Sequence, residues 1–153
     1  MKTYAGVGSR KAPEDVLKLM EKIARRLAEL GWTLRTGGAE GADQAFERGA
    51  RAGGGAVEVF LPWPGYNGYR EGALKAPSSE AVRLAAALHP AWNRLSQGVQ
   101  KLMARNSHQV LGAGLEVGRA RGQPQKRGRV GEDSSAGQGL NQGAAGAAPL
   151  RWA

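Results

Sequence analysis

The chain of 153 residues contains no cysteine and only two histidines, His89 and His108. The absence of cysteine excludes disulfides and thiolate metal sites, and two histidines are too few for a histidine-built metal site unless carboxylates complete it. We therefore expect neither a metal nor a cofactor. No apolar run is long enough to cross a bilayer, and the start MKTYAGVGSR lacks the apolar centre of a signal peptide, so we expect a cytoplasmic protein without membrane contact.

The chain also has few acids for its number of bases, which leaves a formal net charge of +9. Residues 1–111 carry +6 of this charge and residues 112–153 carry +3, and neither part holds a dense Lys/Arg cluster. A basic protein attracts phosphate groups. Charge spread in this way favours a small phosphorylated ligand over nucleic acid, which stays a weaker possibility.

Short β-prone runs alternate with amphipathic segments over the first part of the chain. The expected strands are 2–7, 32–36 and 56–63, and the expected helices are 14–30, 42–51, 79–88 and 94–105. Strand–helix alternation is typical of a parallel sheet with helices on both faces. The fold class predicted is therefore α/β and Rossmann-like, and HQVLG at 108–112 is interpreted as the start of a further strand.

This periodicity ends near Leu111, and the domain boundary is placed there. Residues 112–153 hold ten of the 24 glycines and show neither helical nor alternating spacing of apolar residues. Such a composition buries too little apolar surface to offset the entropy of ordering. We expect residues 1–111 to form a nucleotide-binding domain and residues 112–153 to form a low-complexity, disordered tail.

Two expected strand-to-helix junctions are built from small residues: GVGSR at 6–10 and TGGAEGAD at 36–43. Ligands of open parallel sheets bind beyond the carboxyl ends of the strands, where bare backbone N–H groups can approach an anion. Arg10 could bind a phosphate with two N–H groups. Glu40 or Asp43 could accept from ribose hydroxyls, although an acid at position 43 could equally cap a helix.

These segments resemble the SLOG superfamily, which groups DNA-processing protein A with the Lonely Guy cytokinin-activating enzymes. The likeness is strongest to small stand-alone phage and bacterial members and covers about residues 2–112. It rests on three segments: GSR at 8–10, TGGAEGAD at 36–43 and HPAWNRLSQGVQKLMARNSHQVLG at 89–112. It implies a Rossmann-like fold that binds a nucleotide or a related phosphorylated ligand. The residues assigned to the binding site are Gly8, Ser9, Arg10, Gly37, Gly38, Ala39, Glu40, Gly41, Asp43, Arg105 and Asn106.

The sequence departs from this family after residue 112. The relatives are expected to continue with a hydrophobic strand and another glycine-rich turn, neither of which is present in this chain. The Gly/Ala/Arg/Gln bias of residues 112–153 resembles a GC-rich gene translated out of frame. Our hypothesis is that a frameshift near codons 112–118 left the fold incomplete at its C-terminus, and a divergent native tail is the alternative.

Three functions are compatible with the sequence. The favoured one is nucleotide binding without chemistry, as in a sensor. The second is hydrolysis of a nucleotide N-glycosidic bond, although TGGAEGAD does not match the PGGxGTxxE-type segment on which that chemistry depends in the relatives. The third is binding of single-stranded DNA in the manner of DNA-processing protein A. No catalytic residue is assigned, and association into a homo-oligomer is a further possibility.

Two further groups of residues have a structural and a functional interpretation. Trp63, Tyr66 and Tyr69 lie near Arg70, where aromatic rings could stack on a base or could cover the core. His108 could contact a ligand or be a hydrogen-bonded structural histidine. The structural interpretation is favoured for both groups.

Overall fold

The computed structural model describes residues 1–115, and these contain one three-stranded parallel sheet. The strands are β1 (Lys2–Ala5), β2 (Trp32–Thr36) and β3 (Val57–Val59), in the order β1-β2-β3. Ala5 lies opposite Arg35, and Arg35 lies opposite Glu58, so the register places the carboxyl ends of all three strands at the same edge. The α/β fold class with a parallel sheet is confirmed.

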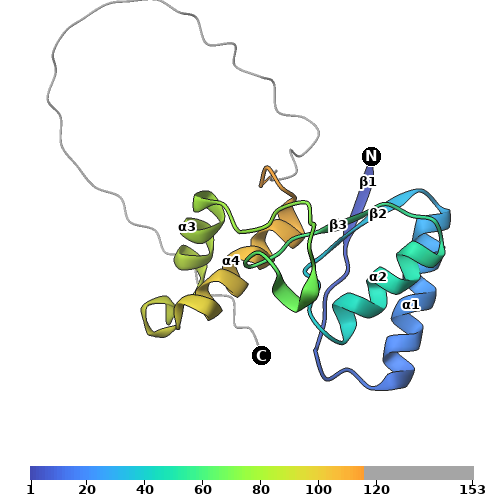
Figure 1. The fold of residues 1–153 in the computed structure, drawn as a ribbon, viewed down its shortest axis with the longest axis horizontal. Helices are drawn as coiled ribbons and strands as arrows, with labels where there is room; N and C mark the ends of the chain where they lie inside the picture. The colour runs from blue at the N-terminus through green and yellow to red at the C-terminus, as the bar shows by residue number, and fades with distance from the viewer. Residues whose placement is uncertain (116–153) are drawn as a thin grey trace, which may run out of the picture. The chain divides into compact units, whose positions relative to one another are not determined.

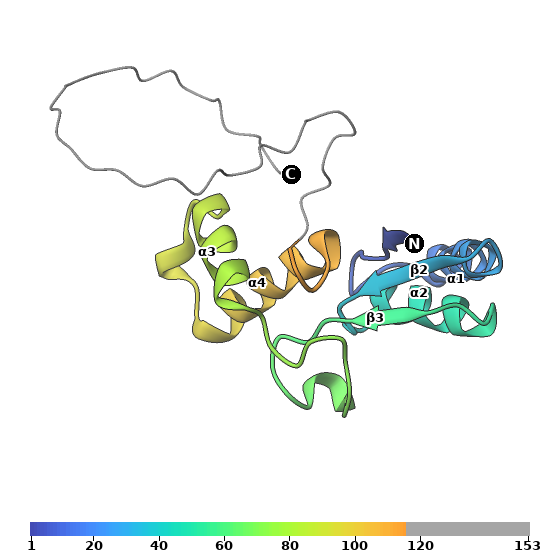
Figure 2. The ribbon, with the colours of Figure 1, turned by 90° about the horizontal axis from the view of Figure 1, so that it is seen from above.

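Two helices cover one face of this sheet, α1 (Glu14–Glu29) and α2 (Ala42–Ala52). Figures 1 and 2 show them side by side over β2. They can approach closely because Gly49 of α2 and Gly53, which follows it, lie against the backbone of α1. Leu34 of β2 is fully buried beneath them and packs with Ala24 and Ala50, which forms the core on this face.

The remaining helices, α3 (Ser79–Leu88) and α4 (Gln97–Leu111), pack on each other. The hydroxyl of Ser78 accepts from the N–H of Ala81 and caps α3, and Ser96 caps α4 in the same way through Val99. A Cβ on Gly112, which ends α4, would come within 2.7 Å of the Arg35 guanidinium. Arg35 and Leu34 are consecutive residues of a strand, so they point to opposite faces, and helices therefore lie on both faces of the sheet.

The expected strand at 108–112 is wrong, because residues 108–111 form the last turn of α4 and Gly112 follows its end. Helix α4 begins three residues later than the expected helix at 94–105 and continues to Leu111. The side chain of His108 is fully buried in this last turn, where Nε2 accepts from the N–H of Ser78 and Nδ1 lies 3.0 Å from the carbonyl oxygen of Gly112. These tertiary bonds hold HQVL in a helix, and they show His108 in its structural role.

The loop after β3 turns back on the sheet and brings its aromatic residues into the core. The N–H of Leu61 donates to the carbonyl oxygen of Leu74, and Phe60 forms an isolated parallel bridge with Leu74. Tyr66 is buried against Val59 and Leu61, with Trp63 and Tyr69 packed around it. The aromatic residues of this loop therefore cover an edge of the core, as the structural interpretation predicted.

The apolar side chains that predicted α1 are only partly buried. Ala24 and Ala28 face the sheet and α2, whereas Leu19, Ile23 and Leu30 are 44–55% exposed. No helix in the described part of the chain is long and apolar enough to span a membrane. The predicted tail lies outside the described residues from position 116 onward.

Candidate functional site

The two glycine turns lie against each other at the carboxyl ends of β1 and β2. A Cβ on Gly41 would come within 2.6 Å of the carbonyl oxygen of Arg10 and 2.7 Å of that of Ser9, and the φ of Gly41 is +79°. The N–H of Ala42 donates to the carbonyl oxygen of Ser9 at 3.2 Å. A Cβ on Gly8 would likewise come within 2.7 Å of the Ala42 Cβ. Glycine is required at position 41 both by its backbone conformation and by this close approach.

The second turn is closed by the protein's own side chains. Asp43 is 4% exposed, and its Oδ2 accepts from the N–H of Gly37 at 3.2 Å and from that of Ala39 at 3.4 Å. The amide of Gln109 in α4 donates to the same oxygen at 3.3 Å. A carboxylate therefore occupies the position at this turn where an anionic ligand was expected, and Asp43 has the geometry of a structural acid.

Arg105 completes this buried cluster from α4. Arg105 is 4% exposed, and its guanidinium donates to the carbonyl oxygen of Gly37 and lies 5.8 Å from the centre of the Tyr66 ring. Burial lowers the pKa of Arg105, and the charge of Asp43 opposes that shift. Burial likewise raises the pKa of Asp43, opposed first by Arg105 and then by the N–H groups of Ala39 and Gly37. The two charges partly offset each other's desolvation.

Tyr69 covers the outer side of the same turn. A Cβ on Gly38, whose φ is +65°, would come within 2.8 Å of the Tyr69 ring. The Tyr69 hydroxyl donates to a carboxylate oxygen of Glu47, and the pKa of Tyr69 is raised by burial and by this hydrogen bond. Asn67 donates to the carbonyl oxygen of Gly38 at 3.0 Å. The loop after β3 thus holds the second turn in one conformation.

The first turn is open to solvent. Gly8, Ser9 and Arg10 are exposed, and within residues 1–115 their backbone N–H groups have no hydrogen-bond acceptor. The Ser9 hydroxyl accepts from the N–H of Lys11 at 3.0 Å. Arg10 donates from one nitrogen to the Tyr66 hydroxyl at 3.3 Å, which leaves the rest of its guanidinium free to contact a ligand. Of the two turns, this one offers unused donors.

The remaining predicted site residues divide between surface and interior. Glu40 and Asn106 are exposed, and the Asn106 side chain accepts from Arg105 Nε at 3.1 Å. Ala39 is 6% exposed. Gln109 was not predicted to belong to the site because residues 108–112 were interpreted as a strand. Its spacing of four from Arg105 would have placed both on one helix face.

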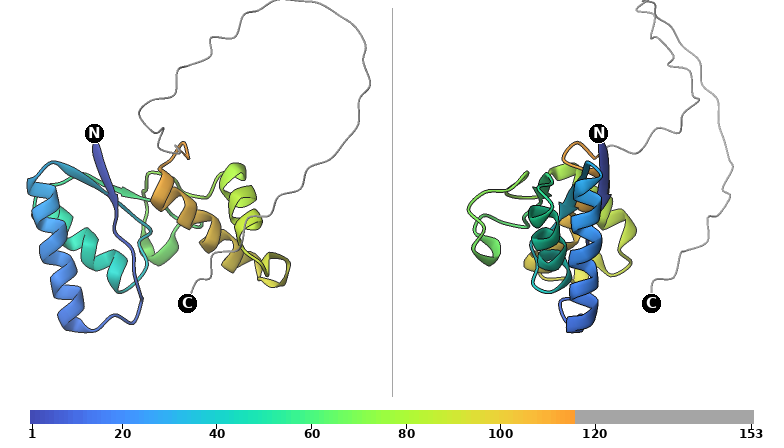
Figure 3. Two further views of the ribbon diagram at one scale, coloured as in Figure 1. Left: turned by 180° about the vertical axis from the view of Figure 1, so that it is seen from behind. Right: turned by 90° about the vertical axis from the view of Figure 1, so that its right-hand side faces the viewer.

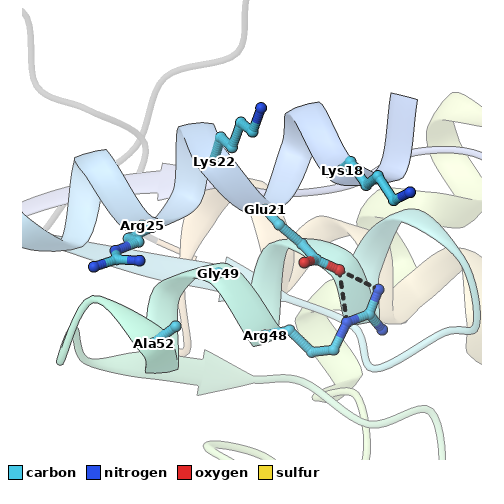
Figure 4. Close-up of a pocket in the computed structure, with 7 residues that line it drawn as sticks. All are labelled: Lys18, Glu21, Lys22, Arg25, Arg48, Gly49 and Ala52. Atoms are coloured by element: carbon cyan, nitrogen blue, oxygen red, sulfur yellow. Dashed lines mark hydrogen bonds and ion pairs between the residues drawn. The ribbon is translucent and has the colours of Figure 1, made fainter. Parts of the chain in front are cut away.

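A basic groove on the outer side of the two N-terminal helices was also missed. Lys18, Lys22 and Arg25 of α1 face Arg48 of α2 across a hollow of about 250 Å³. Figure 4 shows Glu21 between them, paired with Arg48 at 2.5 Å. The sequence interpretation found no dense cluster of bases, because three of these bases are spaced along α1 and the fourth comes from α2. The i, i+4, i+7 spacing of Lys18, Lys22 and Arg25 was the available signal.

Two hollows of the described chain lie away from the glycine turns. Apart from the α1–α2 groove, a second hollow of about 320 Å³ is lined by Ala86 and residues 89–94. Neither includes Gly8, Arg10 or Gly37. Among residues 1–115, no three His, Asp or Glu side chains come together as metal ligands. Residues 8–10 are exposed, so a ligand of the first turn would meet them at the surface.

The parallel sheet, the crossover helices and the paired glycine turns define a Rossmann-like α/β protein. Residues 1–69 match the family model described as DNA recombination-mediator protein A, which covers β1 to β3 and ends at Tyr69. This match confirms the resemblance to DNA-processing protein A over that part of the chain. No curated protein and no solved structure matches the chain.

Proposed function

We propose that the chain binds the phosphate of a nucleotide or a nucleotide-derived ligand at the turn formed by residues 8–10. The observation that carries this proposal is the exposed guanidinium of Arg10 beside backbone N–H groups that have no acceptor in residues 1–115. Bare main-chain donors at the carboxyl end of a parallel strand suit an anion, and a guanidinium fork suits phosphate in particular.

The neighbouring residues fit the rest of such a ligand. Tyr66 fixes one side of the Arg10 guanidinium, so less side-chain entropy is lost when a phosphate binds. Glu40 is exposed at the adjoining turn, where its carboxylate can accept from sugar hydroxyls, and Asn106 offers an exposed amide. In this proposal Asp43 and Arg105 hold the second turn in shape and do not touch the phosphate.

Substituting Arg10→Ala tests this proposal by calorimetric titration with a panel of nucleoside monophosphates, diphosphates and dinucleotides. Loss of a charge-assisted hydrogen bond costs about 1.5–3 kcal/mol, so we expect affinity to fall about 10- to 100-fold. Arg94→Ala, an exposed arginine of the turn Trp92–Arg94, is the matched control and should leave affinity unchanged. Equal affinity of the Arg10→Ala variant and the unchanged chain would refute the phosphate site.

A second candidate function is binding of single-stranded DNA, which the α1–α2 groove favours. Its four bases outnumber the one acid that lines it, and the matching family is named for DNA recombination. A phosphate chain lying in such a groove releases counterions, so its affinity should fall steeply with salt. Lys18→Glu with Lys22→Glu should then weaken oligonucleotide binding in fluorescence anisotropy, whereas Arg10→Ala should not. The opposite pattern would assign the nucleic acid to the first turn.

A further inference from the structure

The hydroxyl of Tyr66 belongs to a side chain that is otherwise part of the core. Tyr66 begins the short turn η1 (Tyr66–Gly68), and 7% of the residue is exposed. Its ring packs on Val59 and Leu61 and meets the Trp63 ring edge to face, with 5.1 Å between the ring centres. Figure 3 shows η1, in green, between the first residues of the chain, in blue, and α4, in orange. The core therefore fixes the position of the hydroxyl.

Two guanidinium groups approach Tyr66, one from each of these segments. Arg10 donates to the hydroxyl oxygen at 3.3 Å, and the guanidinium of Arg105 lies 5.8 Å from the ring centre. Burial lowers the pKa of Arg105; the charge of Asp43 and the Tyr66 hydroxyl oppose this shift, and the charge of Arg10 adds to it. Within residues 1–115 the side chain of Arg10 has only the neutral Tyr66 hydroxyl as a partner. The surroundings of this hydroxyl are therefore positive, which suits an anion.

The proton of this hydroxyl has no acceptor among residues 1–115. A phenolic hydroxyl can accept hydrogen bonds and donate one, and that of Tyr66 accepts from Arg10. The positive charges of Arg10 and Arg105 favour the orientation in which the proton points away from both guanidinium groups. The hydroxyl of Tyr69, by contrast, donates to Glu47. The O–H of Tyr66 is therefore available to a ligand that brings an acceptor.

We propose that the Tyr66 hydroxyl is a further donor to the phosphate bound at residues 8–10, an assignment that rests on the function proposed above. The hydroxyl accepts from Arg10 and donates its own proton to one phosphate oxygen, while the remaining Arg10 nitrogens and the N–H groups of the first turn donate to the other oxygens. A hydroxyl that the core already holds in place loses little entropy when the phosphate binds. Tyr66 thus has two roles, a core ring and a ligand-binding hydroxyl.

Substituting Tyr66→Phe tests this contact, because it removes the hydroxyl and keeps the ring that packs in the core. Titration of the full chain with inorganic phosphate at constant ionic strength, followed by NMR of the backbone amides, measures the affinity. Loss of a hydrogen bond to a charged group should weaken phosphate binding about tenfold. Tyr4→Phe is the matched control: the Tyr4 hydroxyl is buried without a partner in the described chain, so its removal should leave the affinity unchanged. Thermal unfolding without phosphate checks that both variants stay folded.

The variant Arg10→Lys separates direct contact from an effect that passes through Arg10. It keeps a cation but removes the guanidinium that Tyr66 holds, so a direct contact predicts that Tyr66→Phe still weakens binding about tenfold in this background. Disappearance of the effect there, an equal effect of Tyr4→Phe, or no binding of phosphate to the unchanged chain would overturn the assignment. Weaker binding in Arg10→Ala but not in Tyr66→Phe would overturn it and leave the phosphate site standing, whereas unchanged affinity in Arg10→Ala would refute both.

Discussion

Substitution of Asp43 by alanine should destabilise the fold by about 2–4 kcal/mol. One oxygen, Oδ2, accepts from the N–H groups of Gly37 and Ala39 and from the Gln109 amide, at 3.2–3.4 Å. A buried donor left without an acceptor costs about 1–3 kcal/mol. The total cost for the three donors is reduced because the folded state already bears a cost for keeping the buried carboxylate ionised, as the raised pKa of Asp43 indicates. The loss is a large fraction of a typical domain stability of about 5–15 kcal/mol.

The matched variant Asp43→Asn separates the hydrogen bonds from the charge. An asparagine oxygen at the position of Oδ2 still accepts from Gly37 and Ala39. The unopposed charge of Arg105 lowers stability, but removing an ionised carboxylate whose burial is itself unfavourable offsets most of that loss, so we expect a net loss of about 1 kcal/mol. Asp15→Ala removes an exposed acid from the first turn of α1 and should cost about 0.3–1 kcal/mol.

Urea unfolding followed by circular dichroism and tryptophan fluorescence gives the free energies of unfolding. These free energies can be compared when both probes report one transition and the m-value stays constant among variants. A loss below about 1 kcal/mol for Asp43→Ala would show that water or a rearranged α4 replaces the carboxylate. Equal losses for Asp43→Ala and Asp43→Asn would show that charge, rather than hydrogen bonding, closes the second turn.

Two further predictions concern pH and helix packing. Burial raises the pKa of Asp43 in the folded state, so the folded chain binds this proton more tightly than the unfolded chain. The stability of the unchanged protein relative to Asp43→Asn should therefore be highest below about pH 4 and fall as pH rises through the raised pKa. Urea titrations of both proteins between acidic and neutral pH check this, and a stability difference that grows with pH would contradict it. Gly49→Ala should destabilise the fold by about 1–3 kcal/mol, because its methyl group would overlap the carbonyl oxygen of Glu21 and push α1 from α2. The control Gly98→Ala in α4 meets no atom within 4 Å and should be neutral or stabilising by up to about 1 kcal/mol. Thermal unfolding measures both variants, and equal stability changes would show that the helices do not depend on this close approach.

Local sequence signals predicted most of the fold. The expected helices at 14–30 and 79–88 begin where α1 and α3 begin, because their start signals are adjacent in sequence: Pro13, Glu14 and Asp15 for α1, and Ser78 or Ser79 for α3, of which the structure uses Ser78. The end of α4 could not be predicted in this way. His108 and Gln109 are helical because Ser78, Gly112 and Asp43 bind their side chains, and these partners include segments 30 and 66 residues away.

The candidate site shows the same division. The adjacency of the two glycine turns followed from topology, since neighbouring parallel strands end at one edge. The closure of one turn did not, because it depends on Arg105 and Tyr69, which reach Gly37 and Gly38 from distant elements. The exposed face of α1 was also unpredictable from periodicity, which identifies an apolar face without showing whether anything covers it.

The difference between the two turns explains why the proposed function places the phosphate at the first turn. At the second turn a ligand phosphate would have to displace the Asp43 carboxylate from the N–H groups of Gly37 and Ala39, and the displaced charge would remain buried beside it. The phosphate and the buried carboxylate are both negative, and neighbouring like charges repel strongly in a low-dielectric environment. At the first turn an anion would replace only solvent around Ser9 and Arg10. Close packing of the backbone accounts for glycine at positions 8 and 41, and the proposed function adds a second role at residues 8–10, where exposed N–H groups would face a ligand.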